Sequence, residues 1–126
     1  MESSSKTLKC MIVTPERVVM EETVNFLAVP MYDGELGILA ERSPMTGRLG
    51  YGELRTTHGG KTERFYVEGG FVQVQSNVVS VLTPKALPGS SVNVAALEAQ
   101  LSQLTGSALA KAKAQLRVAG KTTATH

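Results

Sequence analysis

The chain changes character once along its length, near Leu87, and this change constrains its fold more than any other feature. Residues 1–87 hold 11 of the 14 Val and 9 of the 12 Gly, whereas residues 88–126 hold 9 of the 12 Ala. Val with Gly is typical of strands and turns, and Ala is typical of helix. Residues 87–91 read Leu-Pro-Gly-Ser-Ser, a natural joint. We therefore expect a β domain over residues 1–87 and a helical region over residues 88–126.

The first region has the pattern of short strands. Leu8, Cys10 and Ile12 alternate with more polar positions, as in a strand with one apolar face. Further strands are expected over residues 17–20, 23–29, 36–39, 52–56, 63–67, 71–75 and 78–82. Turn residues such as Asp33-Gly34 and Gly69-Gly70 separate them, and no helical crossover intervenes. The sequence thus predicts an antiparallel β-sandwich or flattened barrel.

After the joint, apolar residues recur at helical spacing. One stripe consists of Val94, Leu97, Leu101 and Leu104, and a second of Leu109, Ala112 and Leu116. Asn93 is the expected N-cap of the first helix, Gly106 its left-handed end and Ser107 the cap of the second. The sequence predicts a mainly β protein with an α appendage, an antiparallel helical hairpin, and a disordered tail at residues 121–126. The stripes can pack on the sandwich or on each other, dock a partner helix, or lie on a membrane.

Composition excludes several protein classes. With 42% hydrophobic and 19% charged residues and a net charge of +2, the chain is neither a disordered tail nor a strongly basic nucleic-acid binder. Cys10 is the only cysteine, so a reducing compartment fits best. The longest uncharged stretch, residues 69–84, contains polar side chains, so no membrane span is expected. Residues 1–6 lack the features of a signal peptide.

The residues that resemble catalytic motifs do not form one. Both Gly-Lys-Thr triplets lack the glycine of a phosphate loop, with Arg55 and Gln115 at the required positions. His58 falls in an expected turn and His126 ends the chain, so no metal cluster is expected. Cys10 belongs to an apolar strand face and is assigned to the core. The sequence therefore predicts no enzyme site, no metal and no cofactor.

Several segments, in order and spacing, match a known family. They are residues 12–17 (Ile-Val-Thr-Pro-Glu-Arg), 33–39 (Asp-Gly-Glu-Leu-Gly-Ile-Leu), 43–45, 66–74 and 110–118. Through them most of the chain resembles the epsilon subunit of F-type ATP synthases. The resemblance implies a non-catalytic rotor subunit of the central stalk that couples proton translocation to ATP synthesis. It would bind the gamma subunit and the c-subunit ring, peripherally, on the cytoplasmic face of a bacterial inner membrane.

The resemblance also implies contact residues. Those carried over for the c ring are Tyr32, Asp33, Gly34, Glu35, Leu36 and Arg42, and those for gamma are Arg42, Ser43 and Gly47. Glu35 is the foremost ring contact, because it belongs to the Gly-Glu-Leu-Gly turn. Residues 40–44 read Ala-Glu-Arg-Ser-Pro where the family has Pro-Gly-His-Ala-Pro.

The hairpin departs from relatives that bind ATP there. They use an Ile-Asp-x-x-Arg-Ala pattern, but here the acid is replaced by Asn93 and the arginine by Ala96. We expect no tight ATP binding, with an ATP-sensing module as the alternative function. The resemblance further implies that the extended hairpin inhibits ATP hydrolysis. Lys111, Lys113 and Arg117 are candidates for contact with the catalytic alpha and beta subunits, or else a solvated basic face.

Overall fold

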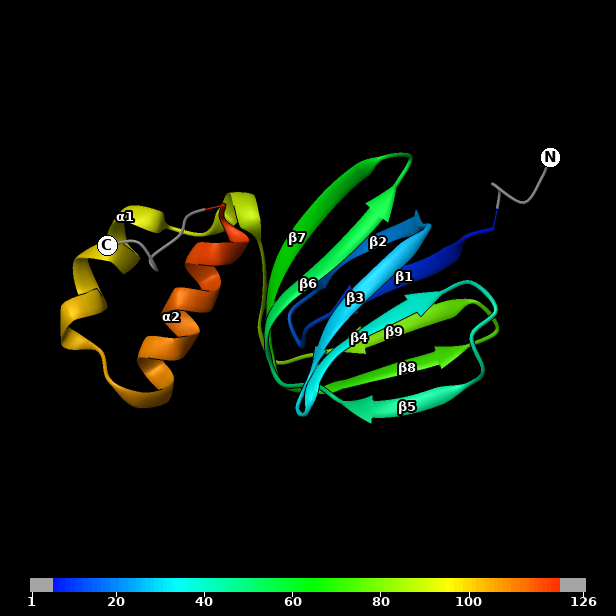
Figure 1. Ribbon diagram of the computed structural model, residues 1–126, viewed down its shortest axis with the longest axis horizontal. Helices are drawn as coiled ribbons and strands as arrows, with labels where there is room; N and C mark the ends of the chain where they lie inside the picture. Colours follow the sequence, from blue (N-terminus) through cyan, green and yellow to red (C-terminus); the bar gives the residue numbers. More distant parts are fainter. Residues whose placement is uncertain (1–5, 121–126) are drawn as a thin grey trace.

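The computed structural model describes residues 6–120, so the expected tail at 121–126 lies outside the described residues. Two five-stranded sheets face each other, and the helices lie to one side of them (Figure 1). The first sheet has the order β2-β1-β9-β8-β5 and the second the order β10-β7-β6-β3-β4. The predicted β-sandwich followed by a helical hairpin is confirmed.

The bounds of the elements are as follows. The first sheet contains β1 (Leu8–Val13), β2 (Val18–Val24), β5 (Met45–Arg48), β8 (Phe71–Gln75) and β9 (Val78–Leu82). The second contains β3 (Phe26–Met31), β4 (Gly34–Leu39), β6 (Tyr51–His58), β7 (Lys61–Glu68) and β10 (Ala86–Pro88). The helical part contains the short 3-10 helices η2 (Gly89–Ser91) and η3 (Leu101–Gln103) and the α-helices α1 (Val94–Gln100) and α2 (Gly106–Val118).

One strand pair is parallel in a sandwich expected to be antiparallel. The hairpins β1–β2 and β8–β9 join through β1 and β9, which run in the same direction. Parallel neighbours need a long connection, and the chain from β2 to β8 supplies it. The short strands β5 and β10 were not expected. Each forms a sheet edge, and Pro88 in β10 is tolerated because an edge strand has a free side.

The expected single strand over residues 23–29 is wrong. The chain leaves the first sheet after Val24 and enters the second at Phe26, so Asn25 marks a crossing between the sheets. Asn25 is held there by its backbone N–H, which donates to the Thr57 carbonyl at 2.8 Å, and by its side-chain oxygen, which accepts from the Gly59 N–H at 3.0 Å. A continuous run of strand-forming residues conceals this crossing in the sequence.

The core lies between the sheets and contains the alternating residues of β1. Leu8, Cys10 and Ile12 are buried, as predicted. Burial, with a smaller contribution from the charge of Glu22, raises the pKa of the Cys10 thiol to about 12. Cys10 is therefore a packing residue with an inert thiol at neutral pH.

The hairpin differs from the prediction at its turn. Asn93 caps α1 as expected, because its side-chain oxygen accepts from the Ala96 N–H at 3.1 Å. Gly106 has the expected positive φ of 59°, but it begins α2 and does not end the first helix. The N-cap of α2 is Thr105, so Ser107 lies inside the helix and its predicted capping role is wrong. The first helix ends earlier, through the 3-10 turn η3.

Helix α2 has two buried sides where the sequence predicted one. Ala112 and Leu116 belong to the predicted stripe, while Ala114 and Val118 are buried on another side. The reason is that α2 lies between α1 and the second sheet (Figure 1). Ala114 and Val118 pack there against Tyr66 and Leu87. None of the described helices is long and apolar enough to cross a membrane.

Candidate functional site

The turn between β3 and β4 exposes polar groups, and backbone hydrogen bonds to the chain beside β5 hold it in place. Tyr32 is 68% exposed, and Asp33 and Gly34 follow it on the surface. The Tyr32 N–H donates to the Arg48 carbonyl at 3.1 Å, and the Gly50 N–H donates to the Pro30 carbonyl at 2.9 Å. Gly34 has a φ of 134°, which favours glycine. The turn is therefore an exposed tip whose backbone is fixed by the chain beside β5.

Arg48, which the sequence did not single out, lies against this tip. Its guanidinium carbon is 5.4 Å from the centroid of the Tyr32 ring, a cation–π arrangement. The two residues are far apart in the sequence and become neighbours because the end of β5 lies beside the end of β3, where Met31 and Leu49 form a bridge. No local sequence signal indicates this pairing.

Glu35 is held by an arginine two strands away. Arg55 on β6 donates to both carboxylate oxygens of Glu35, at 2.9 and 3.4 Å. It also donates to Glu53 at 3.1 Å, and Glu53 accepts from Arg64 at 3.0 Å. The hydrogen bonds to Glu35, and next those to Glu53, raise the pKa of Arg55. We call these four residues the charge ladder: Glu35, Arg55, Glu53 and Arg64. Within it, Arg55 fixes the direction of the Glu35 carboxylate.

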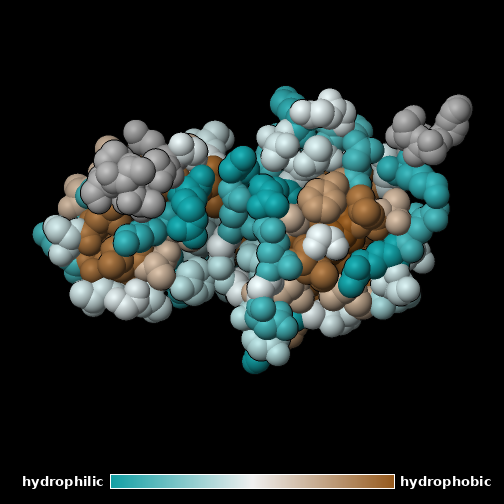
Figure 2. Space-filling model, in the orientation of Figure 1, coloured by the Kyte–Doolittle hydropathy of each residue, from teal (hydrophilic) through white to brown (hydrophobic). Residues whose placement is uncertain are grey.

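Hydrophilic residues gather in a band over the strands nearest the hairpin, between apolar areas of the hairpin and of the sandwich (Figure 2). The charge ladder runs along the same sheet, from β4 across to β7. Leu36, also carried over as a ring contact, points the other way and packs against the core. The exposed groups at the tip are therefore Tyr32, Asp33 and Glu35.

The structure does not bring Arg42 to this tip. Arg42 follows the other end of β4, about 17 Å away at the usual rise of a strand. Its Nε donates to the Met45 sulfur at 3.3 Å, and Ser43 beside it is exposed. Gly47 lies in the edge strand β5, where a Cβ would overlap Met31 Cε. The residues carried over for gamma thus lie in β5 and in the loop before it.

An exposed apolar patch adjoins β5 and was not found from the sequence. Phe71 is 56% exposed and Leu82 48%, and they pair across β8 and β9. A hollow of about 430 Å³ lies beside them, lined by Val13, Thr14, Pro15, Leu82, Thr83 and Pro84. Arg48 pairs with Phe71, so the patch is continuous with the β5 edge. The alternation in residues 71–75 held the signal, because Val72 and Val74 face the core and Phe71 must then face outward.

The three basic residues of α2 have different surroundings. Lys111 Nζ donates to Glu68 at 3.3 Å and lies 5.6 Å from the centroid of the Tyr51 ring. Lys113 and Arg117 are exposed. Within residues 6–120, neither Lys113 nor Arg117 has an ion-pair partner while the hairpin is docked.

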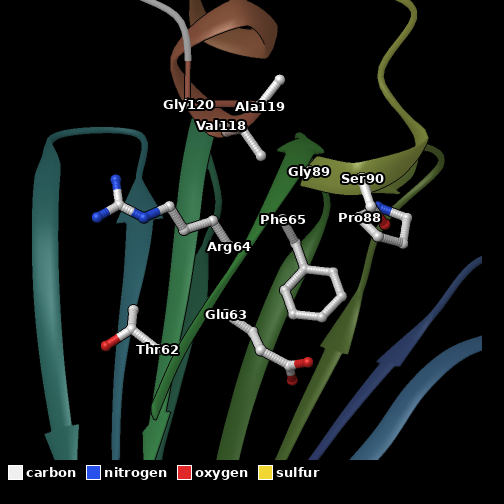
Figure 3. A pocket seen from close by; sticks show the side chains of 10 residues that line it. All are labelled: Thr62, Glu63, Arg64, Phe65, Pro88, Gly89, Ser90, Val118, Ala119 and Gly120. Carbon is white, nitrogen blue, oxygen red and sulfur yellow. The ribbon is translucent and has the colours of Figure 1, made fainter. Parts of the chain in front are cut away.

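A cavity of about 330 Å³ under the end of α2 is the place to look for a nucleotide site, as the alternative function of ATP sensing would require. Its lining includes Arg64, but that guanidinium is bound to Glu53, and Arg64 points away from Phe65 and Glu63 (Figure 3). The carboxylate of Glu63 and the C-terminal end of a helix both repel phosphate. Within residues 6–120, no group of three or more His, Cys, Asp or Glu could hold a metal ion. The cavity is poorly suited to ATP.

The chain is similar to known ATP synthase epsilon chains. The model of the ATP synthase delta/epsilon chain β-sandwich domain matches residues 7–89. An ATP synthase epsilon chain of Rhodopirellula baltica is 50% identical over 82 residues, which cover 65% of this chain and 64% of that relative. The match therefore spans less than two thirds of that relative's length. An ATP synthase epsilon chain of Pelotomaculum thermopropionicum is 39% identical over 94% of this chain and 81% of its own length.

Solved structures agree on the fold. A chain in the Euglena gracilis mitochondrial ATP synthase (OSCP/F1/c-ring) superimposes with a TM-score of 0.65 at 20% identity, covering 90% of this chain and 77% of that chain. A chain of the Tetrahymena thermophila mitochondrial ATP synthase central stalk and c ring gives a TM-score of 0.57 at 15% identity, covering 68% and 69%. With the family match over the whole sandwich, the chain belongs to the ATP synthase epsilon chain family.

Proposed function

We propose that this chain is a non-catalytic rotor subunit of the ATP synthase central stalk, which couples proton translocation through the c ring to ATP synthesis. The observation that carries the proposal is the braced tip at Tyr32, Asp33 and Glu35, in a chain of this family. A contact that transmits torque needs polar groups that keep their positions under mechanical load. The two backbone hydrogen bonds below the tip and the Arg55 clamp on Glu35 meet this need.

The tip is the proposed c-ring surface. Tyr32, Asp33 and Glu35 would face the polar loops of the ring, while Gly34 allows the turn and Leu36 anchors it in the core. Arg48 adds a positive charge next to Tyr32. Such exposed polar contacts set orientation and specificity more than raw affinity.

The proposed gamma surface is the β5 edge with the Phe71–Leu82 patch. It includes Gly47 within the strand, and Arg42 and Ser43 in the loop before it. Exposed aromatic and aliphatic side chains bordered by arginine are typical of the centre of a protein interface. Because Arg48 adjoins both Phe71 and Tyr32, the two proposed surfaces meet at this residue.

The hairpin is the proposed regulatory element. Its extended form would inhibit ATP hydrolysis by contact with the catalytic alpha and beta subunits, through Lys113, Arg117 and, once released, Lys111. The location would be peripheral, on the cytoplasmic face of a bacterial inner membrane, in keeping with the bacterial relatives. ATP sensing remains the alternative, and the loss of the acid and the arginine at Asn93 and Ala96 opposes it.

Co-purification with tagged gamma tests the proposal, with Phe71→Asp as the variant and Thr62→Asp as the control. Thr62 is also exposed, but it lies on β7, in the other sheet from β5 and the Phe71–Leu82 patch. We expect the wild-type and Thr62→Asp chains to bind gamma and Phe71→Asp to lose most of the binding. Absence of binding by the wild-type chain would contradict the rotor assignment. Equal binding by both variants would contradict only the placement of gamma.

A further inference from the structure

Helix α2 packs on β6 and β7 of the sandwich and covers one tyrosine completely. Tyr66 lies on the outer face of β7, yet it is completely buried, because Ala114 and Val118 of α2 cover it. Alanine buries little apolar surface, so this contact gives limited stabilisation. Helix α1 packs on the far side of α2 (Figure 1). Anything that holds α2 to the sheet therefore holds the whole hairpin.

The carboxylate of Glu68 on the sheet accepts a hydrogen bond from this helix. Tyr66 Oη donates to Glu68 Oε1 at 2.8 Å, and Lys111 Nζ donates to Glu68 Oε2 at 3.3 Å. The Lys111 ammonium also lies over the ring of Tyr51, which pairs with Glu68 across β6 and β7. Both carboxylate oxygens are thus occupied, one by the strand that carries Glu68 and the other by the hairpin.

The partial burial of these groups strengthens the contact. The Lys111 and Glu68 side chains are 34% and 30% exposed, less than most ion pairs on this surface. Charge-assisted hydrogen bonds gain strength when water is partly excluded, and breaking one leaves a poorly solvated charge. Lys113 lies two positions further along α2, about 200° around the helix from Lys111. It is exposed, and no hydrogen bond or ion pair joins it to the described part of the sheet.

We propose that Tyr66, Glu68 and Lys111 form a latch that sets how firmly the hairpin is held on the sandwich. Lys111 is the hydrogen-bond donor on the hairpin, and Glu68 is the acceptor on the sheet. Release of Lys111 removes this charged contact. It leaves the packing of α2 on β6 and β7, which includes Leu87, and the Gln115 side chain beside Tyr66. The latch is a property of the chain alone, so it is independent of the rotor assignment.

The joint before α1 lies against the end of α2. Residues 89–91 form the short helix η2, and Val92 N–H donates to the Gly89 carbonyl at 3.3 Å. A Cβ at Gly89 would crowd the carbonyl oxygen of Val118, so glycine allows the joint to lie against the end of α2. Residues 89–93 separate β10 from α1, and none of them contributes to the hydrogen bonds of Glu68 with Tyr66 and Lys111.

Hydrogen–deuterium exchange of the full-length chain tests the latch. We expect Lys111→Glu to raise amide exchange in α2 by roughly tenfold, because repulsion from Glu68 replaces a charge-assisted hydrogen bond. Exchange in β1 and β9 should stay unchanged. The matched control Lys113→Glu makes the same charge change two residues away, and its exchange in α2 should stay within about twofold of wild type.

A charge swap separates the latch from general destabilisation of the helix. The double variant Glu68→Lys with Lys111→Glu restores an opposite-charge pair and should return exchange in α2 most of the way to wild type. Equal amide exchange in α2 of Lys111→Glu and Lys113→Glu would overturn the proposal. Exchange in the double variant that stays as fast as in Lys111→Glu would overturn it as well. If Lys111→Glu unfolds the chain, the same comparison is made between Lys111→Met and Lys113→Met. Amide exchange in α2 should then rise roughly threefold in Lys111→Met and stay near wild type in Lys113→Met.

Discussion

The Glu35 carboxylate accepts hydrogen bonds on both oxygens from Arg55, at 2.9 and 3.4 Å, across the intervening strand β3. Glu35 is therefore a held group, aligned by the sheet before any partner arrives. For a residue proposed to touch the c ring, this alignment reduces the entropy lost on contact. It also predicts that Arg55 is required for the contact although it lies two strands behind it.

Replacement of Glu35 by Ala should leave the isolated fold intact and weaken coupling. The ion pair is half-exposed, so we expect the free energy of unfolding to fall by at most about 1 kcal/mol. ATP-driven proton pumping by the assembled variant should fall, whereas Glu16→Ala, at another exposed position, should not change it. Undiminished pumping by Glu35→Ala would exclude the proposed ring contact.

Replacement of Arg55 by Met should reproduce part of the Glu35→Ala defect. The carboxylate remains but loses its alignment, so coupling should fall less than in Glu35→Ala. Proton pumping and urea unfolding measured on the same preparations check this order. If Arg55→Met pumps like wild type, the alignment of Glu35 has no role in coupling.

Replacement of Gly70 by Ala should destabilise the sandwich strongly. Gly70 has a φ of 99°, and a Cβ there would overlap the Leu82 carbonyl oxygen. We expect a loss of about 3 kcal/mol or more, measured by urea unfolding. Gly59→Ala is the control, since Gly59 also has a positive φ but open space around its Cα. Equal losses in the two variants would mean that the close approach to Leu82 costs nothing.

Docking of the hairpin should weaken in acid through Glu68. Burial alone would raise the pKa of Glu68, but the hydrogen bonds from Tyr66 and Lys111 and the charges of Lys111 and Lys85 outweigh it, so its net pKa is lowered. A carboxyl with a lowered pKa in the docked state contributes stability above its ordinary pKa of about 4.3, and this stability is lost as the pH falls through the lowered value. Amide exchange in α2, corrected for its intrinsic pH dependence, should therefore rise below about pH 4. Glu68→Gln should remove this dependence, and a wild-type chain without it would contradict the assignment.

Cys10 should react with thiol reagents only when the chain opens. Burial raises the pKa of its thiol to about 12, so almost no thiolate is present at pH 8. Labelling at pH 8 should be slow in buffer and fast in concentrated urea. Fast labelling without urea would contradict the burial of β1 between the sheets.

Patterns of burial could be read from the sequence, whereas contacts between distant strands could not. Alternation placed Leu8, Cys10 and Ile12 in the core, and local chemistry identified Asn93 as a cap, because both depend on neighbours in the chain. The crossing at Asn25 was missed because strand-forming residues continue on both sides of it. The second buried side of α2 was missed because alanine gives little periodic signal.

The partners of the candidate site were missed for a related reason. The resemblance supplied Tyr32 and Glu35, but their neighbours Arg48 and Arg55 come from β5 and β6 and depend on sheet order. Lys111 lies on the same face of α2 as Ala114 and Val118, which the sequence did not identify as a buried side. Because this face packs on the sheet, Lys111 meets Glu68 while Lys113 stays exposed.

The most direct measurement for the central claim is reconstitution of the 126-residue chain into a membrane-embedded ATP synthase that lacks its own epsilon subunit, followed by ATP-driven proton pumping. The account predicts a stable complex in which this chain binds gamma and the c ring, and pumping that depends on this chain. In the double variant Tyr32→Ala with Glu35→Ala, pumping should be lost while gamma binding persists. A chain that joins neither gamma nor the ring, or a complex that pumps equally well without it, would contradict the assignment of this protein as a rotor subunit.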